Sequence, residues 1–203
     1  MMTNIKLGFL ASGRGSNMLA IINACKSGKL RANPVLIISN NISSGALEIA
    51  RKENIPSFHL SLRTHSDPEL LDKAITEVLK EYEVDIVILA GYMKKIGPMI
   101  LKTYKNRILN IHPSLLPKFG GQGMYGMQVH EAVLKSGENE TGVTVHLVTD
   151  EYDEGKILAQ RIVKVVEGDT KESLAARVLE VEHALYVEVL QKIVSGVIKL
   201  PAP

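Results

Sequence analysis

The sequence predicts an α/β protein with an open, mostly parallel twisted sheet, helices on both faces, and antiparallel additions near the C-terminus. Strand-like apolar runs alternate with helix-like runs as far as residue 112, a pattern that predicts a parallel sheet. Several of these runs are almost continuously apolar, as in strands covered on both faces. After residue 140 the strands are no longer separated by a helix, which indicates antiparallel or mixed pairing.

The first half of the chain contains five expected strands and four expected helices. The strands are residues 5–11, 35–39, 57–60, 85–90 and 108–112. The helices are residues 17–26, 45–53, 66–82 and 98–104. The third helix begins with a capping-box pattern from Ser66 to Glu69, in which side chains satisfy the free N–H groups of the first turn.

The second half is expected to add two strands and one long helix. The strands are residues 141–148 and 157–166, and Asp169 to Glu172 are expected to cap a helix that ends near Gly196. No element is assigned between the glycine-rich residues 118–126 and the strand at 141. In open α/β sheets ligands bind beyond the carboxyl ends of the strands, so the loops there are the places to search for a site.

Length and composition predict a single domain, residues 1–203, in the cytoplasm. The chain has 203 residues, of which 45% are hydrophobic and 23% charged, as in ordinary globular proteins. A net charge of +2, with both signs interspersed, implies no general attraction to nucleic acid or membranes. The one cysteine, Cys25, fits a reducing compartment. A homodimer is left open.

The first candidate site is the loop Ser12-Gly13-Arg14-Gly15-Ser16-Asn17, between the first strand and the first helix. Glycines allow close backbone approach, and a helix N-terminus offers free N–H groups to an anion such as phosphate. The alternative is a tight turn with Ser16 or Asn17 as N-cap. A dinucleotide is disfavoured because the third fingerprint glycine is missing and Asn40 and Asn41 stand where a carboxylate would bind ribose.

The second candidate is Asn110 and His112 in the stretch NIHPSLLP, where a buried strand ends. Alternate residues of a strand face the same side, so the amide and the imidazole can act together. An amide donor beside a titratable imidazole can hold an oxyanion and move a proton. The alternative is that both side chains only satisfy local backbone groups.

The third candidate is the acidic turn from Asp150 to Gly155. It is either a solvated hairpin turn or the source of a carboxylate that orients and charges His112. His146, on a strand between Val145 and Leu147, is expected to be a hydrogen-bonded core or sheet-face histidine. No Cys/His spacing indicates a metal site.

Over nearly the whole chain, the stretches SGRGSN, LAGYMKKI, NIHPSLLP and TDEYDEGKIL closely resemble the phosphoribosylglycinamide formyltransferases. These are folate-dependent transferases of purine biosynthesis and one-carbon metabolism with a Rossmann-like fold. The resemblance implies catalytic roles for Asn110, His112 and Asp153. It implies ribonucleotide and phosphate contacts by Gly15, Ser16, Asn17 and Glu182, and folate contacts by Met93, Lys94, Lys95, Ile96 and Asn110.

The reaction that the resemblance implies is direct attack of the amine of glycinamide ribonucleotide on the formyl carbon of 10-formyltetrahydrofolate, the co-substrate. It needs no metal and no covalent enzyme intermediate. Asp153 is expected to favour the charged form of His112. Methionyl-tRNA formyltransferase and formyltetrahydrofolate hydrolase share NIHPSLLP but carry additional domains, for which this chain is expected to have no room. A phosphometabolite-binding module without catalysis is the other alternative.

Overall fold

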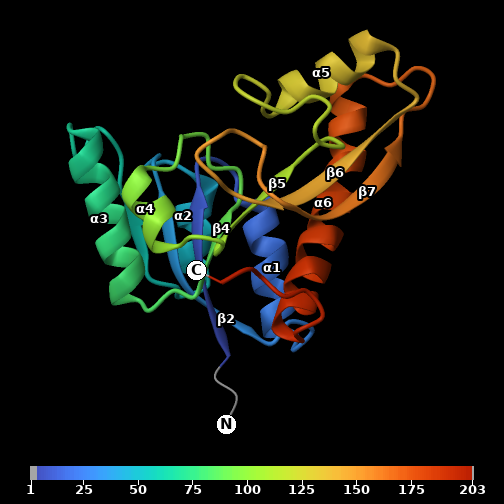
Figure 1. Ribbon diagram of the computed structural model, residues 1–203. Helices are drawn as coiled ribbons and strands as arrows, with labels where there is room; N and C mark the ends of the chain where they lie inside the picture. Colours follow the sequence, from blue (N-terminus) through green and yellow to red (C-terminus); the bar gives the residue numbers. More distant parts are fainter. Residues whose placement is uncertain (1–3, 203) are drawn as a thin grey trace.

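The computed structural model describes residues 4–202 as one seven-stranded sheet with helices on both faces (Figure 1). The strands are β1 (Ile5–Ala11), β2 (Ala32–Ser39), β3 (Ser57–His59), β4 (Ile86–Leu89), β5 (Ile108–His112), β6 (Glu140–Leu147) and β7 (Ile157–Lys164). The helices are α1 (Ser16–Lys26), α2 (Gly45–Lys52), α3 (Pro68–Glu81), α4 (Pro98–Thr103), α5 (Met127–Ser136) and α6 (Lys171–Val194).

The strand order is β3-β2-β1-β4-β5-β6-β7, in which β1 to β5 are parallel and β6 pairs antiparallel with both β5 and β7. This confirms the predicted fold class. The connections from β1 run outward toward β3, and those from β4 run the other way toward β7. The strand order therefore reverses between β1 and β4, and ligands of such sheets bind beyond the strand ends at this point.

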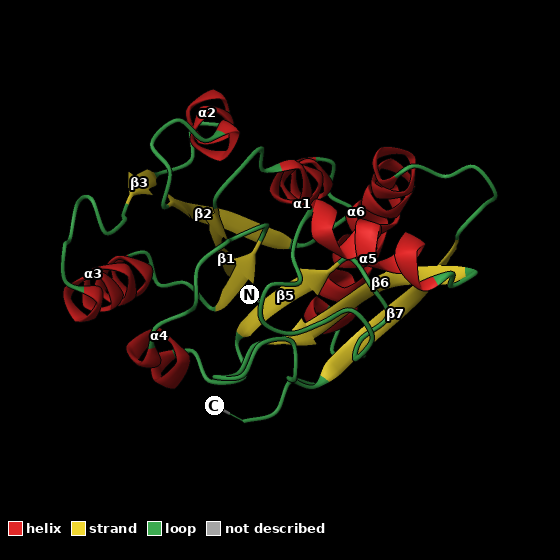
Figure 2. Ribbon diagram, turned by 90° about the horizontal axis from the view of Figure 1, so that it is seen from above, coloured by secondary structure: helices red, strands yellow, loops and turns green. Residues whose placement is uncertain are grey.

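Two apolar cores hold the layers together, one on each face of the sheet (Figure 2). One core contains buried residues of α1, α2, α5 and α6, and the other contains those of α3 and α4. The first is the larger, and the fully buried Phe9, Met18 and Tyr186 belong to it. Among residues 4–202, no helix is both long and apolar enough to cross a membrane.

Helix α5 is the one element that the sequence analysis did not assign. Its buried positions are Val129, His130 and Val133, too few to stand out beside the glycines before it. Gly126 and Gly137 bound the helix, and Gly137 is left-handed, with φ 71°. The tertiary structure stabilises this short helix by packing it against α6, since isolated helices of this length are marginal in water.

The predicted cap of α3 is wrong by one residue, whereas the cap of α6 lies within the predicted residues 169–172. The N-cap of α3 is Asp67, whose carboxylate accepts from the N–H of Glu69, and Pro68 occupies the first turn. The N-cap of α6 is Thr170, which forms a capping box with Ser173. Proline fits the first helical position because its missing N–H has no helical partner there, which makes Asp67 the cap in place of Ser66.

Candidate active site

The loop between β1 and α1 places a helix N-terminus at the carboxyl edge of the sheet. Gly15 is the N-cap, in a left-handed conformation with φ 76°, and no side chain caps the helix. The expected alternative, Ser16 or Asn17 as N-cap, is therefore wrong. An added Cβ on Gly15 would lie 3.1 Å from the Cα of Ala46. The first N–H groups of α1 have no helical partners and can bind an anion.

Asn17, in the first turn of α1, connects this helix N-terminus to the buried side of α6. Its Nδ2 donates a hydrogen bond of 2.7 Å to Oε2 of Glu182 on α6, and both residues are buried. Burial raises the pKa of Glu182 to about 7, and the bond from Asn17 opposes this. Tyr186, one turn further along α6, donates to the carbonyls of Leu89 and Leu109. The tyrosine thus fixes α6 against β4 and β5.

Asn110 and His112 lie at the end of β5 and face the same side, as expected. Asn110 pairs across the strands with His146 of β6, and its Nδ2 lies 3.2 Å from the Nε2 of that histidine. The side chain of His112 is buried, with Nε2 2.7 Å from the carbonyl oxygen of Phe119 and Nδ1 3.5 Å from Oδ2 of Asp153. A carbonyl only accepts hydrogen bonds, so Nε2 of His112 carries a proton.

Asp153 brings the acidic turn onto the two histidines. Its Oδ1 lies 3.5 Å from Nε2 of His146, while its Oδ2 accepts a 3.0 Å bond from the N–H of Gly121. Burial alone would raise the pKa of Asp153, but the histidines and this N–H together lower it. The carboxylate is therefore charged at neutral pH. Of the carboxylates in the turn, it is this one that reaches His112.

The turn reaches the histidines because of its own backbone. Asp153 has φ 59°, a left-handed conformation that aspartate tolerates better than most residues. Two residues later, a Cβ on Gly155 would lie 1.7 Å from the carbonyl oxygen of Leu147. Only glycine allows this close approach to the end of β6.

The expected positive charge on His112 is opposed by its surroundings. Burial lowers the pKa of His112, and the charge of Asp153 and the bond to Phe119 offset only part of this effect. The nearby carboxylate can be expected from the sequence, whereas the burial of His112 depends on the tertiary structure. In a buried site the cost of desolvating a charge can exceed the gain from one partner.

His146 is the residue whose place in the site the sequence analysis missed. It is buried in the sheet, as expected, and its Nδ1 donates to the carbonyl of Leu147 at 2.9 Å. However, its other nitrogen faces both Asn110 and Asp153. The sequence shows a histidine on an alternating strand, but only the antiparallel register of β5 and β6 places it opposite Asn110.

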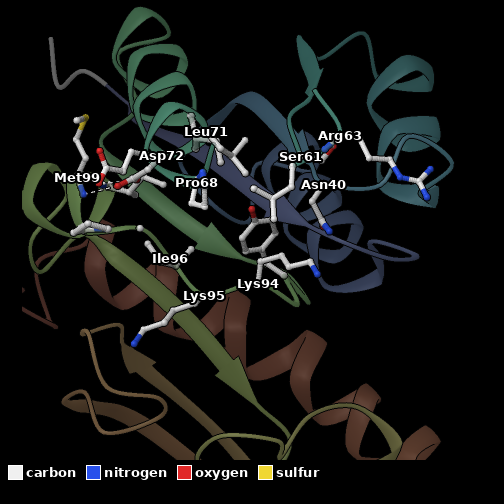
Figure 3. Close-up of a pocket in the computed structure, with 17 residues that line it drawn as sticks. Asn40, Ser61, Arg63, Pro68, Leu71, Asp72, Lys94, Lys95, Ile96 and Met99 are labelled. Atoms are coloured by element: carbon white, nitrogen blue, oxygen red, sulfur yellow. Dashed lines mark hydrogen bonds between the residues drawn. The ribbon is translucent and has the colours of Figure 1, made fainter. Parts of the chain in front are cut away.

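A cavity of about 630 Å³ lies beside the segment after β4, between α3 and α4 (Figure 3). Its wall includes Lys94, Lys95 and Ile96, together with Asn40 and Tyr92. Burial raises the pKa of Tyr92 to about 12, so its hydroxyl stays protonated. The expected folate residues Met93 and Asn110 lie outside this wall. Asn110 is nevertheless close to the segment, since β4 and β5 pair in parallel with Leu89 beside Asn110.

Two residues that line the cavity also contact neighbouring segments. The carboxylate of Asp72 accepts from the N–H groups of Met99 and Ile100 and so caps α4 (Figure 3). The side chain of Lys95 extends away from the cavity, and its ammonium lies 5.5 Å from the centre of the Tyr152 ring. This cation–π contact joins the segment after β4 to the acidic turn.

Residues 4–202 contain no group of three or more acidic, histidine or cysteine side chains arranged to hold a metal ion.

The fold, together with the polar residues gathered where β1, β4 and β5 end, is that of an α/β transferase. The chain belongs to the formyl transferase family, whose model matches residues 5–190. It is 46% identical over 196 residues to the chloroplastic phosphoribosylglycinamide formyltransferase of Arabidopsis thaliana, covering 96% of this chain and 67% of that protein. It is 38% identical to phosphoribosylglycinamide formyltransferase of Escherichia coli, covering 94% and 88%.

A solved structure has the same fold. Glycinamide ribonucleotide transformylase 1 from Symbiobacterium toebii superimposes with a TM-score of 0.92 at 37% identity, over 100% of this chain and 93% of that one. The architecture described above is therefore that of a solved member of the family.

Proposed function

We propose that this protein transfers the formyl group of 10-formyltetrahydrofolate to the amine of glycinamide ribonucleotide, as a single formyltransferase domain in the cytoplasm. The observation that carries the proposal is the convergence of Asn110, His112 and Asp153 at the end of β5. The family match and the names of the relatives support the choice of substrates. A homodimer stays a prediction, to be tested by sedimentation.

The reaction forms one bond and breaks another. The amine nitrogen attacks the formyl carbon and gives a tetrahedral intermediate with a negative oxygen. The bond from carbon to N10 of the folate then breaks, N10 gains a proton and the amine loses one. The amide of Asn110 and an N–H of His112 are the donors for the oxyanion. Asp153 stabilises the charge on His112 and accepts the proton from the amine directly or through water.

His112 is not yet positioned for this role, because the Phe119 carbonyl takes its Nε2–H. Substrate binding has to move Phe119 before that N–H can face the oxyanion. The ribonucleotide phosphate binds at Gly15, Ser16 and Asn17, and Glu182 contacts the same substrate. The folate binds along Met93, Lys94, Lys95 and Ile96, with its formyl group at Asn110.

The test is an assay of the purified protein with both substrates, in which released tetrahydrofolate and formylated ribonucleotide are measured. The two products should appear in equal amounts and only when both substrates are present. Release of formate without ribonucleotide would identify a hydrolase, and binding without turnover would identify a binding module. His112→Ala should abolish turnover, whereas His59→Ala, at the end of β3, should not.

A further inference from the structure

Ser12 joins three loops that follow three different strands. Its Oγ donates a hydrogen bond of 2.6 Å to Oδ1 of Asn40, after β2, and accepts one of 2.8 Å from the N–H of Met93, after β4. Its own N–H donates to the carbonyl of Gly91 at 3.0 Å. Both the donor and the acceptor function of the hydroxyl are thus used between segments that are distant in sequence.

These loops belong to the two proposed subsites. The glycine loop follows Ser12 directly and ends at the N-terminus of α1, where the ribonucleotide phosphate is proposed to bind. Asn40 lines the 630 Å³ cavity, and Lys94 to Ile96, which follow Met93, form part of the same wall. Ser12 is therefore hydrogen-bonded to the loops after β2 and β4 while it belongs to the loop after β1.

We propose that Ser12 is a positioning residue that couples the two substrate subsites, so that occupation of the folate subsite tightens binding of the ribonucleotide, and the reverse. The inference rests on the proposed function. A ligand in the cavity restrains Asn40 and the segment after β4, and both restrain the Ser12 hydroxyl. The adjacent glycine loop is then already ordered, so the phosphate pays a smaller ordering cost when it binds. Coupling of binding free energies is reciprocal.

A purely structural serine would differ in one measurable respect. It would contribute to stability, and its loss would weaken both ligands independently. The loss of a coupling residue instead changes a ratio of two Kd values. These are the Kd of one ligand measured in the absence of the other ligand and the Kd measured in its presence. Ser173 is a matched control, because its hydroxyl also donates to a side-chain oxygen, Asp169 Oδ1 at 2.7 Å, and accepts from a backbone N–H, that of Thr170 at 3.0 Å.

The experiment is calorimetric titration of glycinamide ribonucleotide with and without saturating tetrahydrofolate, which has no formyl group to transfer. In the unsubstituted protein tetrahydrofolate should lower the Kd of the ribonucleotide by at least about fivefold, the lower end of typical coupling. Ser12→Ala should bring this ratio close to one, and Ser173→Ala should preserve it. Asn40→Ala is the second variant, which should also reduce the ratio.

Three results would overturn the inference. They are a ratio of one in the unsubstituted protein, an unchanged ratio in Ser12→Ala, or, if that variant does not fold, an unchanged ratio in Asn40→Ala. If both ligands bind without coupling, the proposed function stands and only the coupling fails. If neither ligand binds the unsubstituted protein, the proposed function fails and the coupling with it.

Discussion

The amide of Asn17 and the carboxylate of Glu182, 165 positions apart in the sequence, form a buried hydrogen bond of 2.7 Å between the first turn of α1 and the middle of α6. Burial raises the pKa of Glu182 from 4.5 to about 7. The folded protein therefore holds a proton on this group between pH 4.5 and 7, where the unfolded chain has lost it. Over that range, a rise in pH favours unfolding.

Glu182→Gln should remove this pH dependence. Relative to the variant, the unsubstituted protein should lose about 3 kcal/mol of unfolding free energy between pH 4.5 and 7, since each pKa unit corresponds to about 1.4 kcal/mol. Urea unfolding at several pH values measures it. Glu180→Gln, at an exposed position of the same helix, is the control. Parallel pH profiles for Glu182→Gln and the unsubstituted protein would mean that Glu182 titrates normally.

Asp153→Asn should lower the pKa of His112 further, because the charge that opposes the effect of burial is removed. If the imidazolium is the active form, turnover should fall, and most steeply on the alkaline side. NMR titration of His112 in both proteins measures the pKa directly. Asp150→Asn, an exposed carboxylate in the same turn, should leave the pKa of His112 unchanged. An unchanged pKa in Asp153→Asn with lost activity would show that Asp153 acts on the proton of the amine.

Asn110→Ala should lower kcat by about 100- to 1000-fold, the usual loss when one preorganised oxyanion donor is removed. The fold should survive, since Asn110 is only half-buried at a strand end. Asn139→Ala, at an exposed position, is the control. Steady-state kinetics with both substrates measure kcat. A loss of kcat below about threefold would mean that Asn110 is a hydrogen-bond partner of His146 and not an oxyanion donor.

Gly15→Ala should weaken ribonucleotide binding far more than folate binding. Alanine at φ 76° is strained by about 1–2 kcal/mol, and its Cβ meets Ala46, which shifts the start of α1. Gly28→Ala carries similar strain at φ 74°, with no atom within 4 Å of the new Cβ, and should affect stability alone. Separate titration of the two ligands tests this. Equal losses for both ligands in Gly15→Ala would place the phosphate elsewhere.

Backbone amides in the second half of the loop at residues 118–126 should exchange rapidly in the free protein and slowly when both substrates are bound. The first half is already attached to the site, because the N–H of Gly121 donates to Asp153. Hydrogen exchange with and without both ligands tests this. If residues 122–126 still exchange fast in the ternary complex, the loop is not a lid over the substrates.

The sequence by itself determined the fold class and identified the three loops of the candidate site. Apolar runs such as residues 86–90 are buried in the fold, and glycine or proline marks the turns, so local sequence patterns were sufficient. Asn110 and His112 could be placed on one side of β5 from strand periodicity alone. Asp153, by contrast, was selected among its acidic neighbours from the family resemblance, and the residues alone left the role of the turn open.

Only the tertiary structure decided the relations between segments distant in the chain. The antiparallel register of β5 and β6 set His146 opposite Asn110, and packing against α6 formed α5. The order of the strands brought Ser12 into contact with both Asn40 and Met93. The net pKa of His112 depends on burial by all its neighbours at once. These properties arise from contacts between elements, and no pattern within one element contains them.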